Sequence, residues 1–367
     1  MKRKLLITVD YEIFGNGTGD VRQHVVDPTA RMAEVCDRYG MPLTVFFEAE
    51  EYLAFDRNRE ALVAGLGYDP AELIAEQVCS LASRGHDFQL HLHPQWYGAG
   101  LEDGNWQLRL EKETVDSLFE TGEDTFRYIG ERKQLIEGLL PCANRRPVIA
   151  YRAGAFSARP GLRLLPALAG NGFQFESSVV RGLHREAEHY QLDYRGVNSH
   201  APMWAVDDDV AVEDSGGAIW EIPIYSQTKR RYRQLTPHRL KAKFSKNVPK
   251  EQQKAMVGRF AQPKHPLKML QTLVEPVPIK LDYHNLPPAE LLKMIRSAPE
   301  PEDSTLPDVL VLIGHTKEHI DDEGFDRFLA GVAADAELEV VTFHDIAECL
   351  SGRGRSAGIS AVETAPV

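Results

Sequence analysis

Short apolar runs recur along the chain, and a helical pattern follows most of them. The runs are rich in β-branched and aromatic residues and have the length of buried strands, about four to eight residues. We therefore expect strands at 4–9, 43–48, 87–93, 148–152, 173–180, 219–224, 278–283, 309–313 and 338–343.

Amphipathic segments between these runs predict helices. Residues 28–39 and 70–84 each begin at a proline preceded by aspartate and stop before a glycine, as helices commonly do. Further helices are expected at 111–139, 160–169, 287–297 and 321–334. The alternation of strand and helix predicts parallel βαβ units, and the number of units favours a barrel over an open doubly wound sheet.

Length and composition are those of a folded, globular protein. A chain of 367 residues with 43% hydrophobic residues can bury a sizeable core without disulfides or a structural metal. Its four cysteines are far apart and form no CxxC pair, which is typical of a reducing compartment. The first apolar run ends at Asp10, too early for a signal peptide, so we expect a cytoplasmic protein.

Charge is distributed unevenly along the chain. The net charge of -12 argues against a general nucleic-acid binder. Segment 226–268, however, holds 13 lysines and arginines and only one acid, and it shows no clear strand. We predict one barrel domain over 1–351 that contains this basic insertion, and a disordered tail at 352–367. The insertion is a candidate surface for an anionic glycolipid or membrane, with a solvated loop as the alternative.

Titratable residues follow the ends of several predicted strands. They are Asp10 and Glu12, His91 and His93, Arg152, and His315, with Asp282 and His284 as further candidates. In a parallel barrel these strand ends lie on one rim, where active sites are built. We therefore expect the side chains to meet in one site.

The two pairs have the spacing of metal ligands. Alternate residues of an extended segment point to the same side, so each pair can face one site. Imidazole groups are common ligands of zinc-like ions, so His91 and His93, with the carboxylate pair Asp10 and Glu12 on another strand end, predict a metal site. The alternatives are a capping or solvated acid and rim histidines that hydrogen-bond to loops.

Arg152 and His315 admit two interpretations each. A guanidinium at the end of an apolar strand needs a carboxylate partner, so Arg152 either orients an acid in the site or closes a structural ion pair. His315, at the mouth of a very hydrophobic strand, is placed either as a proton donor or as a hydrogen-bonded core histidine.

In order and spacing, these motifs resemble those of the polysaccharide deacetylases, the NodB-like carbohydrate esterases, and within them the WalW-like branch. The resemblance covers residues 5–345, nearly the whole chain. It implies an α/β fold, a distorted (β/α)7 TIM-like barrel, with one divalent metal ion for which we expect Zn²⁺. It also implies a role for each strand-end residue: Asp10 of TVDYE as catalytic base, Glu12, His91 and His93 as metal ligands, Arg152 of YRAG as the third motif's arginine, and His315 of VLIGH as general acid.

Two positions depart from the family's motifs. The usual second motif is HxxxH, but Gln95 stands where its second histidine is expected. Either His93 replaces that ligand, or Gln95 or a water completes the site. Glu12 is one methylene longer than the aspartate usual at its position. The metal and the substrate therefore stay open.

Together these features predict a metal-dependent hydrolase that removes an N-acetyl group from a sugar, polysaccharide or glycolipid precursor. One alternative is a hydrolase of a small non-sugar amide. Another is a catalytically degenerate barrel that binds carbohydrate through aromatic residues such as Trp96, Tyr97 and Tyr151. A two-histidine, one-carboxylate iron oxygenase would share the ligand types, but the barrel pattern argues against it. An oligomeric state is not predicted.

Overall fold

The computed structural model describes residues 2–186, 191–197, 201–234, 236–243, 272–318 and 321–352. Its main sheet has the strand order β10-β11-β7-β6-β3-β2-β1-β14, and β15 also pairs with β1. The strands are β1 (Arg3–Tyr11), β2 (Thr44–Glu48), β3 (Asp87–Leu92), β6 (Ala150–Ala153), β7 (Phe175–Glu176), β10 (Trp204–Val206), β11 (Ile219–Glu221), β14 (Val309–Leu312) and β15 (Leu338–Val340).

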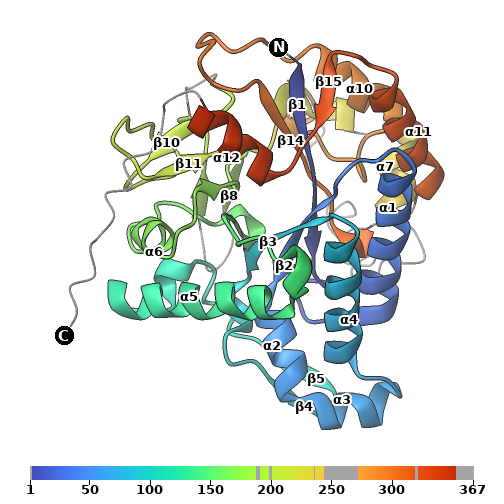
Figure 1. The fold of residues 1–367 in the computed structure, drawn as a ribbon, viewed down its shortest axis with the longest axis vertical. Helices are drawn as coiled ribbons and strands as arrows, with labels where there is room; N and C mark the ends of the chain where they lie inside the picture. Colours follow the sequence, from blue (N-terminus) through green and yellow to red (C-terminus); the bar gives the residue numbers. More distant parts are fainter. Residues whose placement is uncertain are drawn as a thin grey trace.

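The sheet is parallel apart from β10, which is antiparallel to β11. Two single bridges, Ile224 with Val311 and Asp282 with Ile313, pair the segments that follow β11 and β13 (Pro276–Lys280) with β14 and its end, and so curl the sheet. Helices surround the strands (Figure 1). The predicted α/β class and distorted TIM-like barrel are thus confirmed.

Six helices lie where the sequence predicts them. They are α1 (Asp27–Arg38), α4 (Pro70–Ser83), α5 (Gly122–Leu139), α6 (Leu164–Gly170), α10 (Pro288–Arg296) and α11 (Asp322–Ala333). At the start of α4 the Asp69 carboxylate accepts the backbone N–H groups of Ala71 and Glu72, which would otherwise lack partners. The predicted helix 111–139 is too long, because Thr121 caps α5 and a separate short turn precedes it.

Several elements were not expected from the sequence. They are helices α2 (Ala49–Arg57), α3 (Arg59–Leu66), α7 (Pro237–Lys243) and α12 (Phe343–Gly352), and the small antiparallel pairs β4 (Gly100–Glu102) with β5 (Asn105–Gln107) and β8 (His184–Glu186) with β9 (Gln191–Asp193). Helix α12 includes Gly352, the first residue of the predicted tail.

The basic segment 226–268 contains a strand at its start, so the prediction of no strand there is wrong. Strand β12 (Ser226–Arg230) pairs antiparallel with β13 (Pro276–Lys280) in a sheet of its own. The strand is hard to predict from its many lysines and arginines, because it has no apolar face. Backbone pairing with β13 stabilises it instead. Residues 244–271 and 353–367 lie outside the described residues, so the domain and tail boundaries stay predictions.

Buried apolar residues of the strands and of the helices packed on them form one continuous core. None of the helices in the described ranges has a stretch long and apolar enough to cross a lipid bilayer.

Buried His86 makes a pH-dependent contribution to stability. Its Nδ1 accepts the Leu43 N–H at 3.1 Å, a bond that requires a free lone pair, and burial lowers the pKa of His86 to about 4. As pH falls, His86 therefore binds a proton at a higher pH in the unfolded state than in the folded state. We expect the free energy of unfolding to drop by about 2–3 kcal/mol between pH 7 and pH 4 through this residue.

Urea unfolding of wild type and His86→Gln at pH 7 and pH 4 measures this contribution. The variant should lose less stability on acidification than the wild type by that amount. Equal losses in the two proteins would assign the acid sensitivity to other groups.

Candidate active site

The strand-end residues meet at one end of the barrel. Asp10 and Glu12 lie at and just after the end of β1, His91 and His93 at the end of β3, and Arg152 in β6. His315 follows β14 and bridges to Asp10 through the backbone. All six predicted site residues are thus brought together, and all but partly exposed His315 are buried.

Arg152 holds the carboxylate of Asp10. Its Nη1 donates to Asp10 Oδ1 at 2.7 Å and to Thr8 Oγ1 at 3.0 Å, and its Nε donates to the Ser177 carbonyl at 2.9 Å. Burial alone would raise the pKa of Asp10, but the charge of Arg152 opposes this, and the pKa lies below its ordinary value. Asp10 is therefore an oriented, ionised carboxylate at neutral pH.

His315 faces the other oxygen of Asp10. Its Nε2 lies 3.5 Å from Asp10 Oδ2, and its Nδ1 lies 3.7 Å from Glu318 Oε2. Burial lowers the pKa of His315 against the opposing effect of these two carboxylates. Burial therefore favours release of a proton from the imidazolium, whereas the two carboxylates favour its retention.

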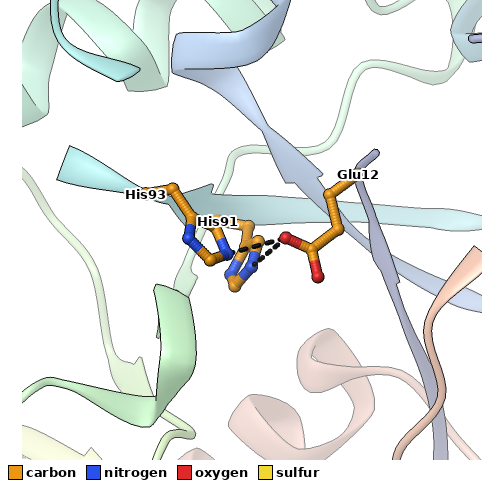
Figure 2. A group of neighbouring side chains, drawn as sticks. All are labelled: Glu12, His91 and His93. Carbon is orange, nitrogen blue, oxygen red and sulfur yellow. Dashed lines mark ion pairs between the residues drawn. The ribbon is translucent and has the colours of Figure 1, made fainter. Parts of the chain in front are cut away.

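Glu12, His91 and His93 form a compact group of nitrogen and oxygen ligands. Figure 2 shows both imidazoles directed at one carboxylate oxygen: Nε2 of His93 lies 2.7 Å and Nε2 of His91 lies 3.7 Å from Glu12 Oε2. One ligand atom from each residue lies within 4.8 Å of the others.

The donor chemistry of this group fits a divalent cation. Nδ1 of His91 lies 2.9 Å from the Arg152 carbonyl, so the proton belongs on Nδ1 and the lone pair on Nε2. That Nε2 is buried and forms no hydrogen bond with the described residues. A buried acceptor without a donor is expensive, and a metal ion would satisfy it.

Glu48, at the end of β2, stabilises this ligand group through a hydrogen bond with the backbone of His93. Its Oε1 accepts the backbone N–H of His93 at 2.9 Å, and its carboxylate also caps α2 by accepting from Glu50 and Glu51. Burial raises the pKa of Glu48 to about 8. Glu48 was not among the predicted site residues, although, like them, it lies at the end of a predicted strand.

Lys317 is a second missed residue. Its Nζ donates to Glu12 Oε1 at 2.6 Å and to the Ile13 carbonyl at 3.2 Å. Burial would raise the pKa of Glu12, but Lys317 and His93 hold it well below its usual range. One oxygen of Glu12 is therefore paired with an ammonium group, which leaves the other for the two histidines.

Gln95 points away from this group. Its amide Nε2 donates to the Gly15 carbonyl at 3.1 Å, whereas His93 faces Glu12. The geometry thus favours His93 over Gln95 at the third ligand position.

A cavity of about 430 Å³ opens in front of these side chains. Asp10, Glu12, His91, His93 and His315 line one side of it, together with Lys317. The two further candidates, Asp282 and His284, line it as well. The cavity therefore presents the candidate base, acid and ligand group to one small molecule or one sugar unit.

Two aromatic residues proposed for sugar stacking do not face the cavity. Trp96 and Tyr151 are fully buried, and Trp96 packs edge to face on Trp106 at 5.1 Å between ring centroids. Tyr97 packs against Phe119 and Tyr128. The stacking interpretation is wrong for the two buried rings.

Comparison with solved structures identifies the fold. A protein from Mycobacterium smegmatis, described as a candidate polysaccharide deacetylase, superposes with a TM-score of 0.50 at 15% identity, over 97% of this chain and 92% of its own. The chain has the polysaccharide deacetylase fold. No protein-family model and no curated protein matches the sequence.

Two other solved structures are more distant. A 4-α-glucanotransferase of Thermococcus litoralis matches with a TM-score of 0.47 at 14% identity, over 95% of this chain and 40% of its own. The PuuE allantoinase matches with a TM-score of 0.45 at 10% identity, over 95% and 90%. Neither changes the assignment of the fold, and the WalW-like branch stays a prediction.

Proposed function

We propose that the protein is a metal-dependent hydrolase that removes an N-acetyl group from a sugar, polysaccharide or glycolipid precursor. One observation carries this proposal: an ionised carboxylate fixed by a buried arginine shares a cavity with a histidine and with a Glu-His-His ligand group. The polysaccharide deacetylase fold of the chain supports it.

Glu12, His91 and His93 would hold one divalent cation, and their nitrogen and oxygen donors suit Zn²⁺. When bound, such an ion polarises the acetyl carbonyl and lowers the pKa of a water molecule. Glu48 and Lys317 keep His93 and Glu12 in place for this role through their hydrogen bonds.

Asp10 acts as the general base. Since Arg152 occupies Oδ1, the oxygen that takes the proton from the attacking water is Oδ2, on the side of His315. The arginine keeps this carboxylate ionised at neutral pH, so it is ready to accept a proton without prior deprotonation.

His315 acts as the general acid. It donates a proton to the amine nitrogen as the C–N bond breaks, from Nε2, the nitrogen directed toward Asp10. Burial lowers the pKa of His315, which favours release of that proton. Asp10 and Glu318 stabilise the imidazolium form before the reaction.

The decisive experiment combines metal analysis of the purified protein with a screen for acetate release from N-acetylated sugars. We expect about one divalent ion per chain and acetate release from at least one sugar. Metal without acetate release would replace the proposal by a hydrolase of small non-sugar amides. Neither metal nor acetate would replace it by a carbohydrate-binding barrel.

The ligand assignment predicts a contrast between two neighbouring positions. His93→Ala should weaken Zn²⁺ binding by more than about 100-fold, because it removes a ligand rather than a supporting contact. Gln95→Ala should leave the affinity within a few-fold of wild type, because Gln95 bonds to Gly15 instead. Competition with a chromogenic chelator measures both affinities, and a large loss in Gln95→Ala alone would reverse the assignment.

The cysteine thiols support a proposal about the compartment. None of the four cysteines pairs with another, and Cys36 is buried, so we propose that the protein works in a reducing, cytoplasmic environment.

A further inference from the structure

A second cavity of about 420 Å³ adjoins the catalytic cavity. Lining residues common to both cavities include two arginines and a lysine from separate elements. They are Arg185 of β8, Arg239 of α7 and Lys280 of β13. A ligand can therefore extend from one cavity into the other past these cations.

The second cavity is strongly basic. Its lining includes six arginine or lysine side chains and two carboxylates, whereas the catalytic cavity has four of each. The six cations are Arg185, Arg195, Arg231, Arg233, Arg239 and Lys280, and the two acids are Glu275 and Asp282. In a chain of net charge -12 this concentration of one sign creates a local field that attracts anions.

Two of these arginines already have partners. Arg231 pairs with Glu275 at 2.7 Å, and Arg195 pairs with Asp193 at 2.6 Å. They contribute less to binding a ligand, because a carboxylate already satisfies each guanidinium.

Arg239 and Lys280 are less well compensated. The Nε of Arg239 is buried, and within the described ranges neither a hydrogen bond nor an ion pair satisfies it. Lys280 has one carboxylate within ion-pair reach, Asp282 at 3.7 Å. Burying cations without full compensation costs free energy, which an anionic ligand between them would recover.

The ring of Phe156 positions the cations at the junction of the cavities. Lys280 Nζ lies 4.5 Å and Arg185 Cζ lies 5.4 Å from its centroid. Phe156 and the preceding Ala155 both have positive φ, 68° and 51°, which non-glycine residues rarely adopt. Strained backbone of this kind is characteristic of functional sites, and here it directs an aromatic ring toward the two cations.

We propose that the second cavity binds the phosphate group of a phosphorylated N-acetylated sugar whose acetamido group lies in the catalytic cavity. The inference rests on the proposed deacetylase function and names its substrate class. Arginine suits this task because its planar guanidinium offers paired donors to phosphate oxygens. A neutral oligosaccharide would supply no charge to complete the compensation of Arg239 and Lys280.

Steady-state acetate release tests the proposal with N-acetylglucosamine and N-acetylglucosamine 1-phosphate. We expect kcat/KM for the phosphorylated sugar to be roughly 10- to 100-fold higher. Arg239→Gln should lower this ratio by about tenfold, and Lys280→Gln should lower it in the same direction. Arg127→Gln removes the same charge from the exposed surface of α5 and should leave the ratio unchanged. A ratio near one, or equal ratios in wild type and both cavity variants, would overturn the proposal.

Binding separates this inference from the proposed function. Calorimetry of N-acetylglucosamine 1-phosphate with Asp10→Asn requires no turnover. Binding that Arg239→Gln abolishes in that background, without acetate release by wild type, would retain the phosphate site and reject the deacetylase. Acetate release without any phosphate preference would retain the deacetylase and reject the phosphate site. Parallel assays with UDP-N-acetylglucosamine and with an N-acetylglucosaminyl diphospholipid in detergent then show whether the phosphate belongs to a nucleotide or a lipid.

Discussion

Replacing Asp10 by asparagine is expected to lower turnover by about 10²- to 10⁴-fold, the usual contribution of a general base. The amide keeps the shape of the side chain and can still accept the hydrogen bond from Arg152, but it cannot take a proton from water. The proposed ligands are Glu12, His91 and His93, so bound metal should stay close to one ion per chain; metal loss in this variant would instead favour the second possible ligand group, Asp10, Glu12 and His315. Initial rates of acetate release and elemental analysis of the same preparation measure both quantities.

Asp69→Asn is a matched control for this substitution. Asp69 caps α4 far along the chain from the site, and asparagine caps a helix about as well as aspartate. That variant should keep wild-type turnover and stability. An Asp10→Asn protein that retained more than half of wild-type turnover would remove Asp10 from the role of base, whatever its metal content.

The strand-end rule predicted most of the site from the sequence. Asp10, His91 and Arg152 are far apart in the sequence, yet each follows or ends an apolar run. In a parallel sheet these ends must lie at one edge, and the observed register places His91 opposite Arg152 and, on its other side, opposite Glu48. The order of the parallel strands was therefore enough to predict that these side chains lie close together, and side-chain packing did not need to be known.

Packing decided what the sequence could not show. In the sequence, Trp96 and Tyr151 cannot be distinguished from exposed aromatic residues that bind sugars. In the structure, the core covers both rings completely. Lys317 lies in a short 3-10 turn, Thr316–Glu318, after β14, and only the backbone path through that turn brings its ammonium group to Glu12. Such contacts depend on loop conformation, which local residue patterns specify poorly.

The second cavity was likewise beyond the sequence. The cations that line both cavities come from β8, α7 and β13, and of these elements only α7 belongs to the segment whose charge stood out. The charge of segment 226–268 indicated only that the segment is able to attract an anion. In the structure, residues from the first part of this segment line a cavity next to the candidate base and acid.

Replacing Arg152 by methionine should destabilise the protein by about 3–5 kcal/mol at pH 7, because it leaves the Asp10 carboxylate buried without its counter-charge. The guanidinium also bonds to Thr8 and to the Ser177 carbonyl, so their buried oxygens lose a donor as well. Urea unfolding of the metal-free protein measures the loss without interference from a bound ion.

The double variant Asp10→Asn/Arg152→Met separates charge from packing. If the unpaired carboxylate causes most of the loss, the double variant should be more stable than Arg152→Met alone, although it carries one more substitution. The pH dependence has a definite sign. Without Arg152, burial raises the pKa of Asp10, so protonation in the folded state should shrink the deficit of Arg152→Met as pH falls from 7 toward 4. A deficit that stayed constant over this range and persisted in the double variant would instead assign the role of Arg152 to packing and to its bonds with Thr8 and Ser177.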